Sequence, residues 1–185
     1  MISLHVETFK DEITSIGAIH LFQPPEHRHF IAQKEFYEEL RVMTEADVAL
    51  RDPVRKLPER ALKEFFAWAQ DIHDATLAGF AVNQHAVSLK NACEKNSAPM
   101  ISIPQILELQ GICYINRIRS KGVENPKPFD LAEILGYVGL ASAPSPCNSL
   151  EQARLESEVL SRLMHGKSLY KAYCKEQFPV PEYIL

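Results

Sequence analysis

The residues of this sequence that could carry metal chemistry are a consecutive histidine and aspartate, His73 and Asp74. They lie within the apolar helical pattern FFAWAQDIHDATLAGF, residues 65–80. Imidazole nitrogens and carboxylate oxygens are common ligands of divalent metals in proteins. A metal held in this way can activate a water molecule for attack on a phosphoester. Two ligands do not enclose a metal, so the remaining ones must come from elsewhere in the chain.

Further candidate ligands occur on both sides of this pair. His27 or His29 precedes it and Asp130 follows it, which gives the order His … His-Asp … Asp. This order resembles the ligand motif of the helical phosphohydrolases of the HD type, and the resemblance covers these positions alone. It implies a metal-dependent phosphohydrolase with His29, His73, Asp74 and Asp130 as the ligands.

Each of these residues also has an interpretation without a metal. His73 follows Ala69 by four positions and Phe66 by seven, so it lies at the edge of the apolar face of a helix. Asp74 lies about 100° further around the helix, towards its polar side. Asp130 stands at the start of another helical pattern, where an aspartate serves as the cap. We therefore treat the hydrolase as the alternative function and predict no cofactor and no bound metal.

The local motifs of other enzyme classes are absent from the sequence. It contains no G-x-S-x-G, no G-x-x-x-x-G-K-[ST] and no G-x-G-x-x-G, the signatures of serine hydrolases, P-loops and dinucleotide-binding folds. The cysteines at positions 93, 113, 147 and 174 are too far apart for a paired zinc motif. A reduced, intracellular protein is the simplest interpretation.

Length, charge and hydropathy narrow the class of protein. A chain of 185 residues fits one domain and can bury a sizeable core. The net charge of −4 argues against a nucleic-acid binder, which is expected to be basic or to carry a basic stripe. No apolar stretch approaches the roughly 20 residues that a membrane helix needs, and the first ten residues do not resemble a signal peptide. We predict a cytoplasmic protein with no membrane span.

The first 22 residues differ from the rest of the chain, because apolar and polar residues alternate in them. Ile2, Leu4 and Val6 are separated by polar residues, and ITSIGAIHLF is rich in β-branched residues. A period of two and this composition are typical of strands. We therefore predict a β-hairpin over residues 1–22.

Beyond residue 22 the apolar residues recur at helical spacing, interrupted by segments that contain proline or glycine. Helices are predicted over residues 25–50, 59–93 (one helix, or two joined near Gly79), 102–122, 130–141, 149–166 and 168–178. The segment 102–122 is apolar on most sides, which places it at the centre of the core. The predicted fold class is mainly α: a single-domain multi-helix bundle over residues 1–185, with a short N-terminal β-hairpin.

The C-terminal segment FPVPEYIL, residues 178–185, is predicted to be extended, because each proline disfavours helix in the preceding residue. Its apolar side chains are those of Phe178, Val180, Tyr183, Ile184 and Leu185. They either pack on their own domain or dock on another protein, as extended segments do at sheet edges and in pockets.

An acidic chain of this size, with apolar segments at both ends and no catalytic motif, is typical of a binding protein. We predict a non-enzymatic adaptor or scaffold subunit that works with other protein subunits inside a larger complex. Bacterial secretion and effector-recruitment adaptors have this general profile.

Overall fold

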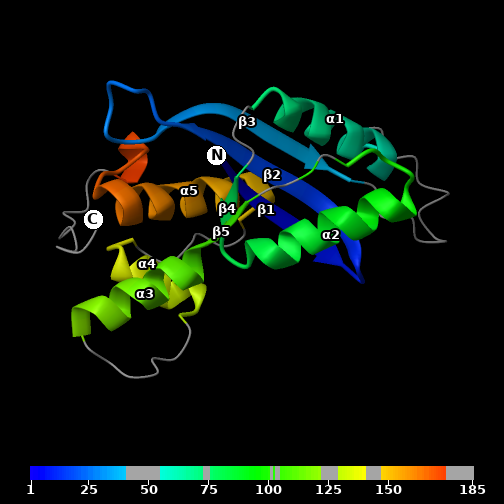
Figure 1. Ribbon diagram of the computed structural model, residues 1–185. Coiled ribbons are helices and arrows are strands. Elements are labelled where there is room, and N and C mark those ends of the chain that lie inside the picture. Colours follow the sequence, from blue (N-terminus) through cyan, green and yellow to red (C-terminus); the bar gives the residue numbers. More distant parts are fainter. Residues whose placement is uncertain are drawn as a thin grey trace.

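The computed structural model describes residues 1–40, 55–72, 76–100, 102, 105–121, 129–140 and 147–173. These residues form an α/β fold, in which a five-stranded mixed sheet has helices on both faces (Figure 1). The predicted mainly α bundle is therefore wrong. Strands occupy three segments that the sequence patterns assign to helices.

The sheet is built around the N-terminal hairpin. β1 (Ile2–Phe9) and β2 (Glu12–Phe22) pair antiparallel, which confirms the predicted hairpin. β3 (Ile31–Glu39) pairs antiparallel with β2. β4 (Leu77–Gly79) pairs parallel with β1, and β5 (Ile106–Glu108) pairs parallel with β4. The strand order is therefore β3-β2-β1-β4-β5, with β1 at the centre.

β3 lies where the sequence predicts a helix over residues 25–50. Phe36 and Leu40 are four positions apart, which fits one face of a helix but also one face of a strand, because strand residues share a face at every second position. Both side chains belong to the core on the same side of the sheet. The strand carries charged residues because it lies at an edge of the sheet, where its side chains are half-buried or exposed.

β4 and β5 also interrupt predicted helices. Each strand is three residues long, which is too short to show a period of two. β4 separates α1 (Pro58–Gln70) from α2 (Val82–Lys95), so the predicted helix over 59–93 is two helices with a strand between them. β5 precedes α3 (Leu109–Lys121) inside the predicted helix over 102–122.

α3 is not the centre of the core that its apolar composition predicts. Leu109 and Cys113 are buried, but Ile115 is 49% exposed. The helix lies with α4 (Leu131–Tyr137) at one end of the molecule, away from α1 (Figure 1). Within the described residues, none of the helices combines the length and the apolar character that crossing a membrane requires.

The predicted helix starts near residues 130 and 149 are confirmed. Asp130 and Glu133 form the predicted capping box of α4. α5 (Ser149–His165) begins with a capping box of Asn148 and Glu151, one residue earlier than the sequence predicts. After α5, a short 3-10 turn, η1 (Lys171–Tyr173), forms part of the segment predicted as the last helix.

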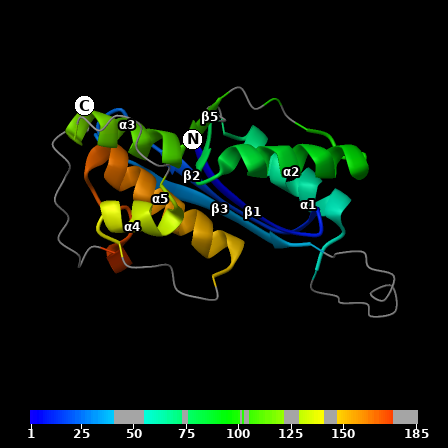
Figure 2. The same ribbon diagram turned by 90° about the horizontal axis from the view of Figure 1, so that it is seen from below.

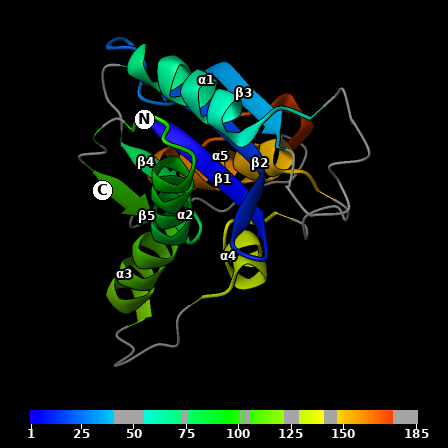
Figure 3. The same cartoon turned by 90° about the vertical axis from the view of Figure 1, so that its right-hand side faces the viewer.

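Two apolar cores lie on opposite faces of the sheet. α1 and α2 cover one face and α5 runs along the other (Figures 2 and 3). The alternation in β1 separates the two faces: Ile2, Leu4 and Val6 belong to the core with α1 and α2. On the other face, the Ser3 hydroxyl donates a hydrogen bond to the carbonyl of Ala153 in α5, at 3.1 Å.

β2 passes very close to the first turn of α5 at Gly17. A Cβ atom at this position would lie 2.2 Å from the carbonyl carbon and oxygen of Ser149 and 2.3 Å from the amide nitrogen of Leu150. Only glycine leaves room for the helix backbone here. This close approach sets α5 directly on the sheet, so that its side chains reach β1.

Candidate functional site

The structure does not assemble the ligand set of an HD-type hydrolase among its described residues. His73 and Asp74 lie outside them. The carboxylate of Asp130 accepts the amide N–H of Glu133 at 2.8 Å as the cap of α4. His29 lies in the connection between β2 and β3, beside His27. The hydrolase thus stays a prediction, without the helical bundle on which it depended.

The predicted partner-binding residues of the tail, Phe178, Val180, Tyr183, Ile184 and Leu185, also lie outside the described residues. The described chain ends at Tyr173, the last residue of η1. Two other features of the described residues can carry a function: a cluster of three polar side chains beside β1, and a pocket beside α5.

The first feature is a cluster of His5 from β1, His85 from α2 and Glu156 from α5. No motif in the sequence joins these three residues. Their possible ligand atoms all lie within 4.8 Å of one another. His5 Nδ1 is 2.9 Å from Glu156 Oε1. The rings of His5 and His85 meet edge to face, with centroids 4.7 Å apart. This is an arrangement of nitrogen and oxygen ligands that could hold a metal ion.

The cluster lies at the carboxyl end of β4. The last residue pair between β1 and β4 joins Ser3 to Ala78, so His5 is level with the turn that follows β4. Ligands of open α/β sheets bind outside the carboxyl ends of the strands. At this end a Cβ on Gly79 would lie 2.7 Å from Glu156 Oε2 and 2.9 Å from the carbonyl of Leu4. Glycine therefore makes room for the carboxylate.

The turn between β4 and α2 holds two carboxylates by its backbone. The amide of Phe80 donates to Glu156 Oε2 at 3.0 Å, and the amide of Ala81 donates to Glu108 Oε1 at 2.8 Å. Ala81 adopts a left-handed conformation with φ 53°, and this conformation turns the chain into α2. Glu156 is thereby anchored through one oxygen and keeps the other, Oε1, towards His5.

Burial governs protonation in the cluster. Glu156 is fully buried, which raises the pKa of its carboxyl, while the hydrogen bond with His5 acts in the opposite direction. Burial, together with the charge of His5, lowers the pKa of His85 to about 4, against a smaller effect of the Phe80 backbone. The His85 imidazole is therefore neutral at pH 7. Its Nε2 is buried and has no hydrogen-bond partner in the described part of the chain.

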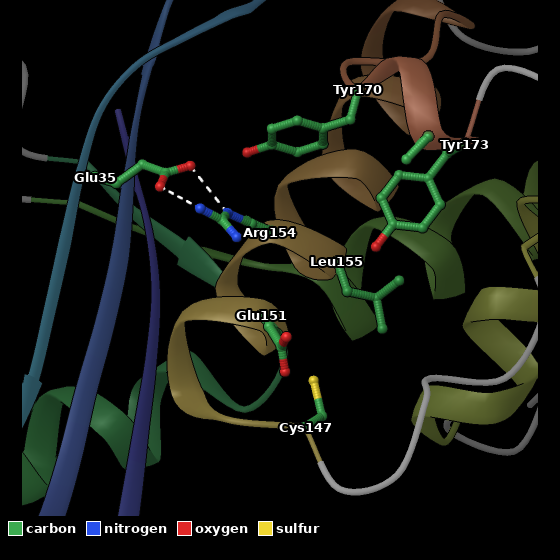
Figure 4. A pocket seen from close by; sticks show the side chains of 8 residues that line it. Glu35, Cys147, Glu151, Arg154, Leu155, Tyr170 and Tyr173 are labelled. Carbon is green, nitrogen blue, oxygen red and sulfur yellow. Dashed lines mark hydrogen bonds and ion pairs between the residues drawn. The ribbon is translucent and has the colours of Figure 1, made fainter.

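The second feature is a pocket of about 390 Å³ between β3, α5 and the C-terminal turn (Figure 4). It is lined by Glu35, Cys147, Glu151, Arg154, Leu155, Tyr170, Ala172 and Tyr173. The two tyrosine rings and Leu155 supply apolar surface, and the polar groups lie around them (Figure 4). Such a mixture of apolar walls and a few polar groups is typical of binding pockets.

The polar groups of this pocket already have partners or lack nucleophilic character. Arg154 and Glu35 form a two-point ion pair across the pocket, with Nε at 2.9 Å from Oε1. Glu151 accepts the amide of Asn148 as part of the α5 cap. Burial raises the pKa of the Cys147 thiol, so the thiol and not the reactive thiolate predominates at neutral pH.

The wall formed by residues 167–173 is fixed by a buried ion pair in α5. Glu158 is 0% exposed and Arg162 is 1% exposed, and their closest atoms are 2.7 Å apart. Glu158 accepts the amides of Leu169 and Tyr170 at 2.7 and 3.1 Å. Arg162 donates to the carbonyl of Tyr173 at 2.8 Å. The two tyrosines of the pocket are therefore held by the core of the molecule.

Comparison with models of known protein families and with curated protein sequences finds no match to this chain.

Proposed function

We propose that this chain is a non-enzymatic adaptor or scaffold subunit that binds other protein subunits inside a larger complex. The observation that carries the proposal is the pocket beside α5, with Arg154, Tyr170 and Tyr173 in its lining. Tyrosine and arginine are enriched among the residues that dominate the binding energy of protein interfaces. We propose that the pocket takes an apolar anchor side chain of a partner protein.

The state of the polar groups supports binding over catalysis at this pocket. The guanidinium of Arg154 is neutralised by Glu35, and the burial of Cys147 favours its thiol. The described lining therefore presents no activated nucleophile. An apolar anchor needs mainly the ring faces of Tyr170 and Tyr173, because Leu155 lines the pocket but is only 2% exposed.

The neighbouring edge strand offers a second element for the same partner. β3 contributes Glu35 to the pocket and lies at the edge of the sheet. Among the described residues, the outer side of β3 is paired only where Leu40 meets Lys56, just beyond the strand. A partner segment could add to this edge by main-chain hydrogen bonds while its anchor enters the pocket, a common mode of peptide recognition.

The proposal keeps the predicted tail contacts, cellular location and class of partner. The tail residues Phe178, Val180, Tyr183, Ile184 and Leu185 are proposed as additional partner contacts. A cytoplasmic location is proposed on the same sequence evidence, and the net charge of −4 favours protein over nucleic acid as the partner. A role in bacterial secretion or effector recruitment is the most specific form of this proposal.

The experiment is affinity capture of the full chain from its native host, followed by mass spectrometry. The test variant is Ala172→Trp, because Ala172 is exposed and lines the pocket, so the new ring would fill it. The matched control is Ala67→Trp, the same change at an exposed position of α1. We expect the wild type and the control to capture the same partner in near-equal amount to the bait, and Ala172→Trp to lose it.

Two results would contradict the proposal at different levels. Capture of no partner in comparable amount by the wild type would refute the adaptor function. Capture of the same partner by Ala172→Trp, at unchanged melting temperature, would show that the partner binds elsewhere on the chain.

A further inference from the structure

The cluster of His5, His85 and Glu156 is not used by the proposed pocket and needs its own explanation. Its members come from β1, α2 and α5, and positions 5 and 156 are 151 residues apart in sequence. Glu156 is fully buried beside them. A buried carboxylate is costly unless a cation or several hydrogen-bond donors compensate it.

We propose that His5, His85 and Glu156 bind one divalent transition-metal ion of the zinc class. Two imidazoles and one carboxylate are a common three-ligand set for Zn²⁺, with a water molecule in the fourth position. Mg²⁺ and Ca²⁺ prefer all-oxygen ligands, so this set selects against them. The proposal is independent of the partner-binding pocket.

The distances place the ligands close to the spacing that such an ion requires. Ligand atoms at about 2.1 Å from a tetrahedral zinc stand roughly 3.4 Å apart. His5 Nδ1 and Glu156 Oε1 are 2.9 Å apart, and all three ligand atoms lie within 4.8 Å of one another. The observed separations therefore bracket the spacing of a tetrahedral zinc site.

The surroundings orient two of the ligands as they do in known metal centres, where hydrogen bonds to outer groups fix the ligands. The amide of Phe80 holds Glu156 through Oε2, while Oε1, which also accepts the side-chain amide of Gln152 at 3.3 Å, faces His5. The backbone of Phe80 also interacts with the His85 ring. His85 Nε2 is buried and has no hydrogen-bond partner in the described residues, so this nitrogen is free to bind the ion.

The position also gives an ion a path from solvent. The side chain of His5 is 21% exposed, whereas that of Glu156 is 0% exposed. The open coordination position therefore lies on the side of His5, near the carboxyl end of β4. A water molecule or a ligand atom from solution can fill it.

The test is a metal titration of the full chain after removal of metal with a chelator. Zn²⁺ is added in competition with a chromophoric chelator, and Mg²⁺ is tested separately. We expect one Zn²⁺ per chain, a higher melting temperature with Zn²⁺, and no comparable effect of Mg²⁺. Glu156→Gln and His85→Ala should each weaken Zn²⁺ binding beyond the 10–100-fold that loss of an outer-shell group costs.

The chain offers a matched control in its second histidine pair. His27 and His29 have ring centroids 5.2 Å apart, and the double change His27→Gln, His29→Gln should leave the affinity unchanged. X-ray absorption of the zinc-bound protein should show nitrogen and oxygen neighbours and no sulfur. A sulfur shell would assign the ion to a cysteine and overturn the proposal.

Three other outcomes would overturn it as well. These are no stoichiometric Zn²⁺ on the wild type, loss of Zn²⁺ with the His27 and His29 control, and retention of Zn²⁺ by the folded Glu156→Gln and His85→Ala variants. In the first case the three side chains form a metal-free hydrogen-bonded cluster. If one of the two variants fails to fold, the other variant, together with the control pair, decides the site.

Discussion

Replacing Arg162 by methionine should remove a large part of the stability of this protein. The guanidinium is 1% exposed and its partner carboxylate, Glu158, is 0% exposed. Methionine has a similar length but no charge, so the carboxylate would stay buried without its cation. Breaking a buried ion pair in this way costs about 3–5 kcal/mol, and a typical domain has only about 5–15 kcal/mol in total.

The structure indicates that the loss falls within this range. In Arg162→Met, Glu158 keeps the amides of Leu169 and Tyr170 and the hydroxyl of Ser168, so its charge is still partly compensated. The carbonyl of Tyr173 loses the donor at 2.8 Å that Arg162 provides. We therefore expect the free energy of unfolding to fall by about 3 kcal/mol, the lower end of that range.

The measurement is urea denaturation followed by circular dichroism. Arg154→Met, the same change on the same helix, is the control. Its ion pair with Glu35 is 40% and 37% exposed, and such pairs contribute about 0–1 kcal/mol. The double variant Glu158→Gln, Arg162→Met should lose less than the sum of the single variants, by about 0.5–3 kcal/mol. A loss below about 1 kcal/mol for Arg162→Met would refute this reasoning.

Three further changes test other parts of the structure. Gly17→Ala should lower the free energy of unfolding by about 1–3 kcal/mol, since its Cβ would meet the backbone of Ser149 at 2.2 Å; a melting temperature equal to that of the wild type would show that α5 does not approach β2 so closely. Leu89→Ala should lower the free energy of unfolding by about 2–5 kcal/mol, because Leu89 is 0% exposed. Val87→Ala, on the same helix at a position that is 57% exposed, should change it by no more than about 0.5 kcal/mol. Burial and neighbouring cations lower the pKa of His165 in the folded protein. As the pH falls below about 6.5, His165 is therefore protonated in the unfolded chain before it is protonated in the folded one. The contribution of His165 to the free energy of unfolding is therefore complete above that pH and is lost as the pH falls. The free energy of unfolding should decrease from pH 7 to pH 5, and it should decrease less steeply in the His165→Gln variant.

Local signals in the sequence predicted the elements that depend on local physics. The alternation of Ile2, Leu4 and Val6 identified the hairpin, because a half-buried strand shows its two faces in the sequence. Asp130 identified the start of α4, because a cap is made by residues three positions apart. These signals do not need the rest of the fold, and the structure confirms both.

The strands that were missed carry no such signal. β4 is buried along its whole length, so no polar residue alternates with its apolar ones, and Gly79 in it suggested only a helix kink. Phe36 and Leu40 satisfy the spacing of a helix and of a strand alike. The wrong fold class thus followed from three segments where periodicity cannot separate the two structures.

The cluster at His5 could not be predicted for a different reason. The position of His5 on the polar face of β1 follows from the alternation in the hairpin, but nothing in the sequence relates His5 to His85 or Glu156. Those two meet it only because β4 pairs with β1 and α5 crosses the sheet at Gly17. The predicted mainly α fold contains neither the pairing of β4 with β1 nor the contact of α5 with the sheet, so it could not bring the three side chains together. A metal site formed by three elements therefore depends on the topology, and its ligands become recognisable only when the strand order is known.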